Sequence, residues 1–308
     1  MIDFLLKKKE TDIWAIGITR ASTTDFIKSP GKREVKWIYP PKKFSMIADP
    51  FGVWHKNKLY IFFEALDYRN KIGKIDCMIF NNNLDKIETF TLLKNEHHHS
   101  YPFILKDRNY FYMVPETSSS NTTSLYIFKE FPKKIVEVKN VFPKIGLIDS
   151  SFIKYKNKWW CFYALKGKNN EDIKCLHIMY SKLITGPWLP HENNPVRTDI
   201  SSSRPGGLPF LSDGKIILPV QDCSKTYGGG IKLLQINKIS NKKFNAEIIN
   251  SVSPSLLNRK YRDGIHTISS AGPYILFDVK NILKSNYRLL INLEKRFMRL
   301  ARKLKIRL

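Results

Sequence analysis

Pairs of short apolar runs, joined by a polar turn, recur along most of the chain. Five stretches share this layout: ADPFGVWHKNKLYIFFE (residues 48–64), SYPFILKDRNYFYMVPE (100–116), DSSFIKYKNKWWCFYAL (149–165), GLPFLSDGKIILPVQD (207–222) and the shorter DGIHTISSAGPYILFD (263–278). Their turns, such as KNK and SDG, use residues that tolerate a tight chain reversal. Each stretch therefore predicts a β-hairpin.

The hairpins recur at a period of about fifty residues. Phe51, Phe103, Phe152 and Phe210 lie 52, 49 and 58 residues apart, and further β-rich runs such as IDCMIF and GIKLLQI fall between the hairpins. A unit of three or four antiparallel strands, repeated about five times at this period, is typical of a β-propeller, although a β-sandwich also has strands at short intervals. We expect an all-β fold in which residues 1–278 form a five-bladed β-propeller.

The pattern becomes helical only near the C-terminal end. Between residues 280 and 308, six apolar residues recur at three- and four-residue steps: Leu290, Leu293, Phe297, Leu300, Leu304 and Leu308. The same segment contains ten Lys or Arg and one acid, Glu294. This pattern predicts a short basic amphipathic α-helix over residues 279–308. Such a helix binds an anionic membrane surface through residues 280–308, or else packs its leucines on the propeller.

Composition and charge narrow the class of protein. The chain has 308 residues, of which 43% are apolar, and this is enough for a buried core and excludes a disordered chain. It contains no run of 18 apolar residues, so we expect no membrane-spanning helix. The formal net charge of +25 favours anionic partners, but no nucleic-acid-binding motif accompanies it, so we expect no nucleic-acid partner.

The cysteines and the first residues favour the cytoplasm. Cys77, Cys161, Cys175 and Cys223 are far apart and form no CxxC pair, which is typical of buried thiols in a reducing compartment. In the opening MIDFLLKKKETD the basic cluster follows the apolar stretch, which reverses the order in a signal peptide. We expect a cytoplasmic protein that is peripheral on the inner face of the membrane.

Polar residues stand at matching positions of the hairpins. In a propeller the first strand of each blade lines the central channel, and the hairpin returns the end of the second strand to the same mouth. The starts of the first strands contribute Asp49, His99, Tyr101, Asp149, Arg204 and His266, and the ends of the second strands contribute Glu64, Glu116, Gln221 and Asp222. We expect these side chains to line one pocket, with Tyr227 of the YGGG run beside it.

Carboxylates gathered in one pocket have two common uses. They accept hydrogen bonds from sugar hydroxyls, or they act as acid and base at a glycosidic centre. Arg204 has the planar fork that suits an anionic group, unless it pairs with a pocket acid. Metal binding is a further use of acids and histidines, but neighbours in the run His97–His99 point to opposite faces of a strand and cannot all ligate one ion. We expect a site without metal or cofactor.

Several pieces of the sequence resemble a known family. The pieces WAIGI, FSMIADPF, YIFFEAL, HHSYPF, VPET, LIDSSF, SKLITGPWLPHENNPV, SRPGG and VQDCSKTYGGG closely resemble the N-terminal domain of plant glucosamine inositolphosphorylceramide transferases. Similar domains occur in bacterial surface-polysaccharide loci. The resemblance covers roughly residues 14–278 and implies a five-bladed propeller similar to that of arabinanases, invertases and levansucrases.

The resemblance also implies roles for individual residues. In that wider group a first-blade Asp acts as nucleophile or base, a third-blade Asp supports it, and a later Glu is the acid. Asp49 matches the first position and Asp149 the second. No EC or EGP motif follows Asp149, so Glu116 or Asp222 has to serve as the acid. The remaining residues are expected to bind substrate: Glu64, His99, Tyr101, Arg204, Gln221, Tyr227 and His266.

The activity that the resemblance implies is that of a glycosyltransferase. It would act in the biosynthesis of a surface polysaccharide (capsule or lipopolysaccharide) or a glycolipid, with a nucleotide sugar or lipid-linked sugar as donor and a glycan acceptor as partners. No D-x-D or GxGxxG motif is present, so transfer would have to take place in the propeller itself. A furanosidase-type glycoside hydrolase and a non-catalytic glycan-binding module are the alternatives.

Overall fold

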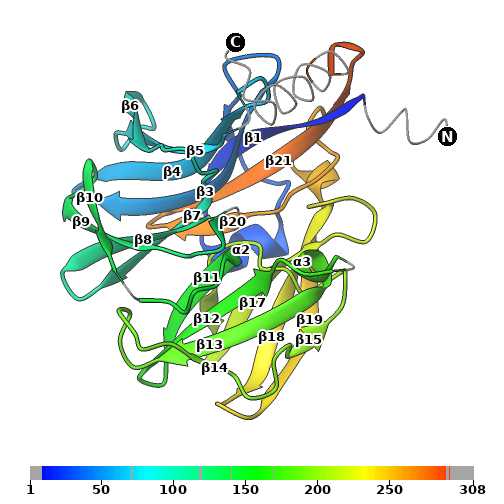
Figure 1. The fold of residues 1–308 in the computed structure, drawn as a ribbon. Helices are drawn as coiled ribbons and strands as arrows, with labels where there is room; N and C mark the ends of the chain where they lie inside the picture. The colour runs from blue at the N-terminus through cyan, green and yellow to red at the C-terminus, as the bar shows by residue number, and fades with distance from the viewer. Residues whose placement is uncertain are drawn as a thin grey trace, which may run out of the picture.

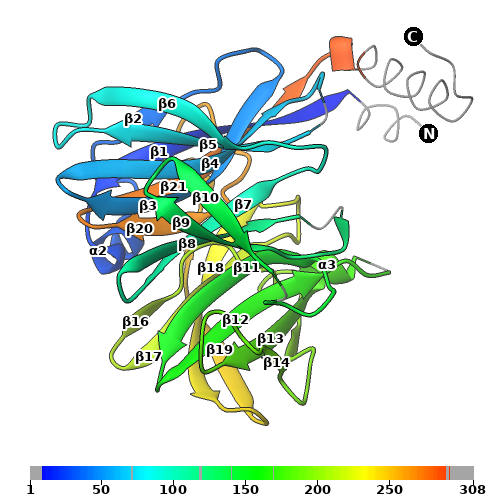
Figure 2. The same ribbon diagram turned by 60° about the vertical axis from the view of Figure 1, so that its left-hand side comes forward.

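The chain folds into a ring of five antiparallel β-sheets, shown from two directions in Figures 1 and 2. The structure is a computed structural model, and it describes residues 9–70, 72–117, 120–139, 141–168, 170–288 and 291. In the four blades built from consecutive strands, the first strand lies at one edge of its sheet and later strands follow in chain order. This arrangement confirms the five-bladed β-propeller and rules out the sandwich.

Four blades are built from consecutive strands. Blade I contains β3 (Ser45–His55), β4 (Lys58–Asp67), β5 (Lys74–Phe80) and β6 (Lys86–Leu93). Blade II contains β7 (Ser100–Asp107), β8 (Tyr110–Glu116), β9 (Leu125–Glu130) and β10 (Lys134–Val138). Blade III contains β11 (Leu147–Tyr155), β12 (Lys158–Leu165), β13 (Cys175–Ser181), β14 (Leu189–Pro190) and β15 (Arg197–Thr198), and blade IV contains β16 (Phe210–Ser212), β17 (Lys215–Asp222), β18 (Gly230–Ile239) and β19 (Phe244–Val252). Short helical turns lie in connections: α2 (Thr23–Lys28), α3 (Glu171–Lys174) and η2 (Pro254–Leu256).

Blade V brings together strands from the two ends of the described chain. It contains, in sheet order, β20 (Ile268–Ala271), β21 (Tyr274–Lys284), β1 (Glu10–Arg20) and β2 (Lys36–Ile38). The β1–β21 pairing runs from Glu10 opposite Lys284 to Arg20 opposite Tyr274. The fifth repeat supplies only the hairpin β20–β21, and two N-terminal strands complete its sheet. Strand β21 continues past residue 278 to Lys284, so the propeller includes the first residues of the segment expected to be helical.

The remainder of that segment, within residues 279–308, is only partly described. Tyr287 packs against Phe44 with ring centroids 5.0 Å apart, and the Arg288 guanidinium lies 4.6 Å from the ring centroid of Tyr68. Residues 289–290 and 292–308 lie outside the described residues, so the basic amphipathic helix stays a prediction. Within the described part of the chain, no helix has both the length and the apolar character needed to cross a membrane.

The inner strands of blades I to III share a bulge that shapes the mouth of the channel. In each of β3, β7 and β11, two residues lie opposite a single residue of the neighbouring strand. The first residue of each bulge has a left-handed backbone, with φ of 53° at Asp49, 43° at Tyr101 and 47° at Asp149. Bulges of this kind redirect side chains beside active sites, and Asp adopts left-handed φ more readily than most residues. Asp49, Tyr101 and Asp149 are therefore structural equivalents in three successive blades.

Aromatic side chains fill the space between these inner strands. Phe51 lies 4.8 Å from Tyr101 and 5.1 Å from Phe103, and Phe103 lies 5.3 Å from Phe152, measured between ring centroids. All of them are buried, and buried aromatic pairs at these distances add to the stability that burial alone provides. This packing fixes blades I to III relative to one another below the mouth. All four cysteines are buried and form no disulfide, as the sequence predicts.

Candidate active site

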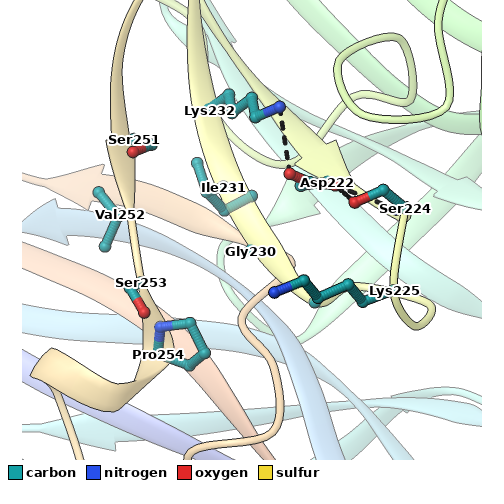
Figure 3. A pocket seen from close by; sticks show the side chains of 11 residues that line it. Asp222, Ser224, Lys225, Gly230, Ile231, Lys232, Ser251, Val252, Ser253 and Pro254 are labelled. Carbon is teal, nitrogen blue, oxygen red and sulfur yellow. Dashed lines mark hydrogen bonds and ion pairs between the residues drawn. The ribbon is translucent and has the colours of Figure 1, made fainter.

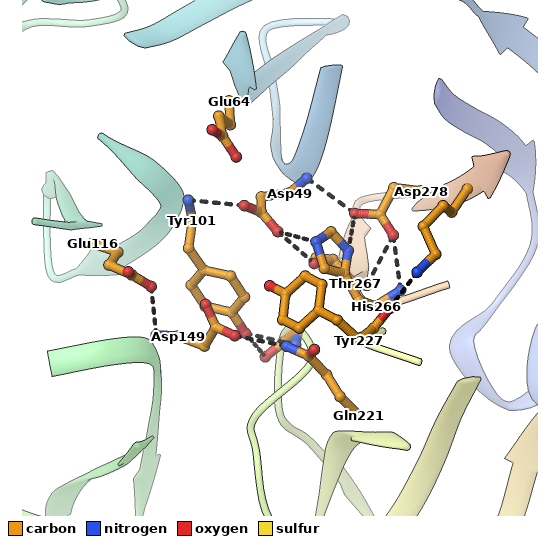
Figure 4. Close-up of polar contacts among 12 residues, drawn as sticks. Asp49, Glu64, Tyr101, Glu116, Asp149, Gln221, Tyr227, His266, Thr267 and Asp278 are labelled. Carbon is orange, nitrogen blue, oxygen red and sulfur yellow. Dashed lines mark hydrogen bonds and ion pairs between the residues drawn. The ribbon is translucent and has the colours of Figure 1, made fainter. Parts of the chain in front are cut away.

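A polar pocket of about 240 Å³ lies at the mouth of the central channel, and we call it the acidic pocket. Its lining comes from all five blades: Asp12, Trp14, Met46, Asp49, Glu64, Leu66, Tyr68, His98, Ser100, Glu116, Asp149, Arg204, Tyr227 and His266. Seven of the predicted site residues are among them, namely Asp49, Glu64, Glu116, Asp149, Arg204, Tyr227 and His266. The repeat register therefore does bring most of the predicted side chains to one opening (Figure 4).

Asp49 is held in place by two neighbouring blades. Its Oδ2 accepts the backbone N–H of Tyr101 at 3.1 Å, and its Oδ1 accepts the hydroxyl of Thr267 at 2.9 Å. The Nε2 atom of His266 lies 3.4 Å from Oδ1, and the ring stacks on Trp14 with centroids 3.8 Å apart. The carboxyl group is thus fixed by short contacts while it still lines the pocket.

Burial changes the protonation of this group. Asp49 is only 4% exposed, and loss of solvation raises the pKa of its carboxyl to about 7, which the opposing charge of His266 only partly offsets. Burial also lowers the pKa of His266, but the carboxylates of Asp278 and Asp49 outweigh burial and raise that pKa to about 9. A carboxyl with a pKa near 7 can accept and release a proton at neutral pH.

Asp149 occupies the equivalent position of blade III and has different partners. Its Oδ2 accepts the Nε–H of Arg204 and the side-chain amide of Gln221, each at 2.6 Å. Arg204 also donates to the backbone carbonyl of Asp172 at 3.1 Å, and its guanidinium lies 5.1 Å from the ring centroid of Tyr227. Arg204 therefore pairs with a pocket acid, which was the alternative to binding an anion directly.

Two further carboxylates line the pocket from the ends of the second strands. Glu116 Oε2 accepts the backbone N–H of Asp149 at 3.2 Å. Glu64 is buried, with its Oε1 3.2 Å from Nε2 of His98. Burial opposes a charge on His98, but its hydrogen bond to Glu64 and nearby carboxylates raise the pKa of the imidazole. Glu64 and Glu116 thus add negative charge on the blade I and blade II sides.

Asp222 and His99, both predicted site residues, do not reach the acidic pocket. Asp222 lies at the end of β17 beside Gln221, and adjacent strand residues point to opposite faces, so the amide of Gln221 faces the site while Asp222 lines a separate outer pocket. His99 turns inward, with its Nε2 2.7 Å from Asn95 Oδ1, and burial lowers its pKa to about 4. His98, its neighbour, is the histidine that lines the pocket.

Tyr101 and Gln221 act beneath the pocket surface. Tyr101 is fully buried, and its hydroxyl accepts the backbone N–H of Gly207 at 2.6 Å and lies 2.8 Å from Ser151 Oγ. Its ring packs against Phe51 below the mouth, and its backbone N–H donates to Asp49. Tyr101 therefore contacts the site through its backbone. Gln221 likewise contacts Asp149 instead of lining the open pocket.

The sequence pattern missed the residue that organises the blade V side. Asp278 is fully buried: its Oδ1 accepts the N–H groups of His266 and Thr267 at 3.0 Å each, and its Oδ2 accepts the N–H of Asp49 at 3.0 Å. Oδ2 also lies 2.7 Å from Nδ1 of His266. Asp278 ends the fifth hairpin just as Glu64 and Glu116 end the first two, and that shared position is the signal that could have identified it.

Trp14 and Lys280 were also missed, because β1 and the end of β21 stand outside the hairpin repeat. Lys280 is fully buried and donates to the backbone carbonyl of Tyr227 at 2.5 Å and to Thr226 Oγ1 at 3.1 Å. Its ammonium lies 5.3 Å from the ring centroid of Trp14. Lys280 therefore fixes the Tyr227 loop against blade V.

One cluster within the described residues has atoms of the kinds that ligate metals. Ligand-type atoms of Asp49, His266 and Asp278 lie within 4.8 Å of one another. The imidazole of His266 stands between the two carboxylates, with Nε2 toward Asp49 and Nδ1 toward Asp278. A metal ion would have to displace one of these pairs, so the arrangement favours a hydrogen-bonded network, and a site without metal stays our prediction.

Comparison with protein families gives a match over most of the propeller. The model described as "Glucosamine inositolphosphorylceramide transferase 1, N-terminal" matches residues 39–269. A glucosamine inositolphosphorylceramide transferase 1 of Oryza sativa subsp. indica is 35% identical over 217 residues, which are 67% of this chain and 28% of the relative. The Arabidopsis thaliana protein of the same name is 29% identical over 210 residues, which are 65% of this chain and 26% of the relative. The chain thus spans little more than a quarter of the length of these relatives.

Solved structures with a similar fold include an α-L-arabinofuranosidase and a family 117 glycoside hydrolase. The α-L-arabinofuranosidase PaAbf62A from Podospora anserina superposes with a TM-score of 0.57 at 10% identity, over 76% of this chain and 90% of that one. Zg3597, a family 117 glycoside hydrolase of Zobellia galactanivorans, gives a TM-score of 0.51 at 13% identity, over 77% and 75%. At such low identity the likeness shows the propeller fold alone.

Proposed function

We propose that this chain, which belongs to the family of the N-terminal domain of glucosamine inositolphosphorylceramide transferase 1, transfers a sugar in the biosynthesis of a glycolipid or a surface polysaccharide. The donor is a sugar carried on phosphate, as in a nucleotide sugar or lipid-linked sugar. The acceptor is a hydroxyl group of a glycan or of an inositol-containing phospholipid. The names of the relatives support a sugar as the transferred group and an inositol-containing lipid as the acceptor, since they combine glucosamine with an inositolphosphorylceramide.

The observation that carries the proposal is the state of Asp49. It is a buried carboxyl that lines the acidic pocket, and its pKa is raised to about 7. General bases work best when their pKa lies near the working pH. We assign Asp49 as the base: it takes the proton of the acceptor hydroxyl as that oxygen attacks the anomeric carbon. The bond from that carbon to the donor phosphate breaks, and its electron pair leaves with the phosphate.

The surroundings of Asp149 support transfer over hydrolysis. The charge that develops on the sugar in such reactions is positive, and the Asp149 side chain faces it from blade III. The blade IV partner of Asp149 is the amide of Gln221, and an amide cannot protonate a leaving group at neutral pH. A donor whose leaving group is phosphate departs as an anion and does not require that proton. Glu116 is the one of the two proposed acids that lines the pocket, where it can hold a substrate hydroxyl.

We also propose that the protein works at the cytoplasmic face of a membrane, with the part of the basic segment beyond β21, residues 285–308, on anionic lipid. The net charge of +25 and the eight basic residues of residues 285–308 support this. Strand β21 ends opposite Glu10, near Asp12 and Trp14, which line the pocket. The chain beyond β21 therefore leaves the propeller on the side of the mouth, where a lipid acceptor would enter.

The proposal is tested by incubating the full chain with a panel of nucleotide sugars and vesicles that contain an inositol phospholipid. Parallel reactions contain aryl glycosides alone. Transfer predicts a glycosylated lipid, detected by mass spectrometry, and no cleavage of the aryl glycosides. Cleavage of aryl glycosides without transfer would assign the chain to the hydrolases. Binding of glycans without either reaction would make it a binding module.

A further inference from the structure

The acidic pocket is poorly suited to hold the phosphate that the proposed donor or acceptor carries. Its lining contains five carboxylates, from Asp12, Asp49, Glu64, Glu116 and Asp149. The cationic side chains that line this pocket already pair with carboxylates of the protein. Arg204 pairs with Asp149, and His266 lies between Asp49 and Asp278. A phosphate placed here would meet more negative than free positive charge, so it has to lie elsewhere.

A second pocket adjoins the first across the end of β17. This outer pocket has a volume of about 220 Å³, which is about seven times the share of one water in the liquid. Its lining is Asp222, Ser224, Lys225, Gly229, Gly230, Ile231, Lys232, Ser251, Val252, Ser253 and Pro254 (Figure 3). Gln221 and Asp222 are consecutive: Gln221 holds Asp149 beneath the surface of the acidic pocket, and Asp222 lines the outer pocket. The loop after β17 carries Lys225 on the outer pocket and Tyr227 on the acidic pocket, so one short loop contributes to both.

The one acid of the outer pocket is neutralised within the protein. Lys232 Nζ lies 3.1 Å from Asp222 Oδ2, and the Ser224 hydroxyl donates to Oδ1 at 2.5 Å. Burial alone would raise the pKa of Asp222, but these partners outweigh it and hold the pKa below its usual value. Asp222 is thus a charged group with its partners in place, and it does not need a cation from a ligand.

Lys225 is the cationic side chain of the outer pocket that forms no ion pair within the described residues. Among the residues that the structure describes, its ammonium has no carboxylate or carbonyl partner, and Figure 3 shows it extending toward the Gly230 end of β18 with Ser253 and Pro254 on the far side. The hydroxyl groups of Ser251 and Ser253 belong to exposed residues of the same lining. An ammonium together with hydroxyl donors is the chemistry that binds phosphate oxygens.

We infer that the outer pocket binds the phosphate group of a substrate whose sugar or acceptor hydroxyl lies in the acidic pocket. Lys225 supplies the charge and Ser253 a hydroxyl donor, while the Tyr227 loop separates the phosphate from the carboxylates. The inference rests on the proposed function for the identity of the substrate, but binding of phosphate itself does not depend on turnover. The phosphate belongs either to a soluble sugar donor or to a lipid headgroup.

Calorimetric titration of the full chain with inorganic pyrophosphate and with uridine diphosphate tests the site. Lys225→Ala is expected to raise the dissociation constant about tenfold, the loss of one charge-assisted hydrogen bond. Lys242→Ala is the matched control: this exposed lysine pairs with Glu192 beyond the outer pocket, and its removal is expected to leave binding unchanged. Ser253→Ala, which keeps every charge, is expected to weaken binding less than Lys225→Ala.

Vesicles distinguish the two sources of phosphate. Flotation with phosphatidylinositol vesicles that depends on Lys225, without binding of the soluble diphosphates, would assign the pocket to a lipid headgroup. Binding of uridine diphosphate that depends on Lys225 would assign it to the donor. Equal affinity of the wild type and Lys225→Ala for every probe, or equal weakening by Lys242→Ala, would overturn the inference. Lys225-dependent binding without any sugar transfer would leave the site standing and remove only the proposed function.

Discussion

Two adjacent hydrogen-bonding networks give the carboxyls of Asp49 and Asp149 different properties. Asp49 faces His266, and His266 is in turn held by Asp278. Asp149 faces Arg204 and Gln221. Environments that differ in this way are how two carboxyls of one site take different roles. The residue that acts on the acceptor is therefore set by its neighbours, which makes those neighbours testable.

The pair formed by Asp49 and His266 predicts the pH dependence of transfer. The base must be deprotonated, so kcat/KM should rise with pH through about 7, and it should fall again as His266 loses its charge near pH 9. The positive charge of His266 lowers the pKa of Asp49. His266→Gln should therefore move the lower limb to higher pH and abolish the upper limb. An unchanged profile of initial rates from pH 5 to 10 in this variant would show that the pair does not control the reaction.

Asp278 is predicted to act by positioning. Asp278→Asn keeps the shape of the side chain but cannot hold a charged His266 in the same orientation, so kcat should fall on the order of 100-fold, the cost of a reacting group misplaced by about 1 Å. KM should change little, because Asp278 does not line the acidic pocket. The proton resonances of His266 in NMR should also report a lower imidazole pKa. A wild-type kcat together with a lowered His266 pKa would separate this residue from the reaction.

For single residues, the sequence pattern predicted which parts of the chain reach the mouth better than it predicted which side chains face it. The repeat register predicted that Asp49, Glu64, Glu116 and Asp149 share one opening, and they do, because equivalent positions of blades converge by symmetry. It placed Asp222 and His99 at the mouth, but Asp222 lines the outer pocket, and His98, the neighbour of His99, lines the acidic pocket. Asp278 carried the same signal as Glu64 but lay in the shortest repeat.

At the scale of strands, the bulges of β3, β7 and β11 shape the site. Phe51 pairs with Phe62 and Phe103 with Val114, whereas in blade III the residue at this register is Ser151, opposite Phe162. The alignment on Phe152 was therefore shifted by one residue relative to the first two hairpins. A bulge adds a residue without changing apolar alternation on either side, so the pattern alone did not show it.

Gly207 is predicted to be the least replaceable position of the inner ring. It has φ of 134°, its N–H donates to Tyr101, and an added Cβ would collide with the backbone of Ile268. Gly207→Ala should lower the free energy of unfolding by several kcal/mol, since both backbone strain and steric overlap oppose it. The change is measured by thermal or denaturant unfolding.

Gly214→Ala is the control for this substitution. Gly214 also has a positive φ, of 73°, but no atom lies within 4 Å of the added Cβ. Its replacement should cost only about 1 kcal/mol for the backbone conformation. Equal destabilisation by the two substitutions would mean that the packing of Gly207 between blades is not what matters.

At the scale of the whole molecule, the ring is closed by β1 and β21, and it places an acidic pocket on a chain with a net charge of +25. The five-fold repeat predicted the ring because each hairpin has to bury its faces against two others. The closure was not predicted, since β1 pairs with a strand more than 250 positions away and no local pattern encodes that partner. The charge favours an anionic partner, and Arg288, four residues after the end of β21, packs on Tyr68, which lines the acidic pocket.

Deletion of residues 292–308 tests the membrane proposal. The deletion should begin after Ile291, because residues up to Lys284 belong to β21 and Ile291 is buried. The shortened chain should lose sedimentation with vesicles rich in anionic lipid, while its melting temperature stays near that of the intact chain. Neutral vesicles provide the control for non-electrostatic binding. Unchanged sedimentation with anionic vesicles would contradict membrane contact through this segment.

The central proposal is that Asp49 is the base of a sugar-transfer reaction in the acidic pocket. Single-turnover transfer by the wild type and Asp49→Asn at pH 8, with donor affinity measured for both, tests it most directly. We expect a rate at least 100-fold lower in the variant, as is typical when a general base is removed, with donor affinity nearly unchanged. A variant that transfers sugar at the wild-type rate would contradict it.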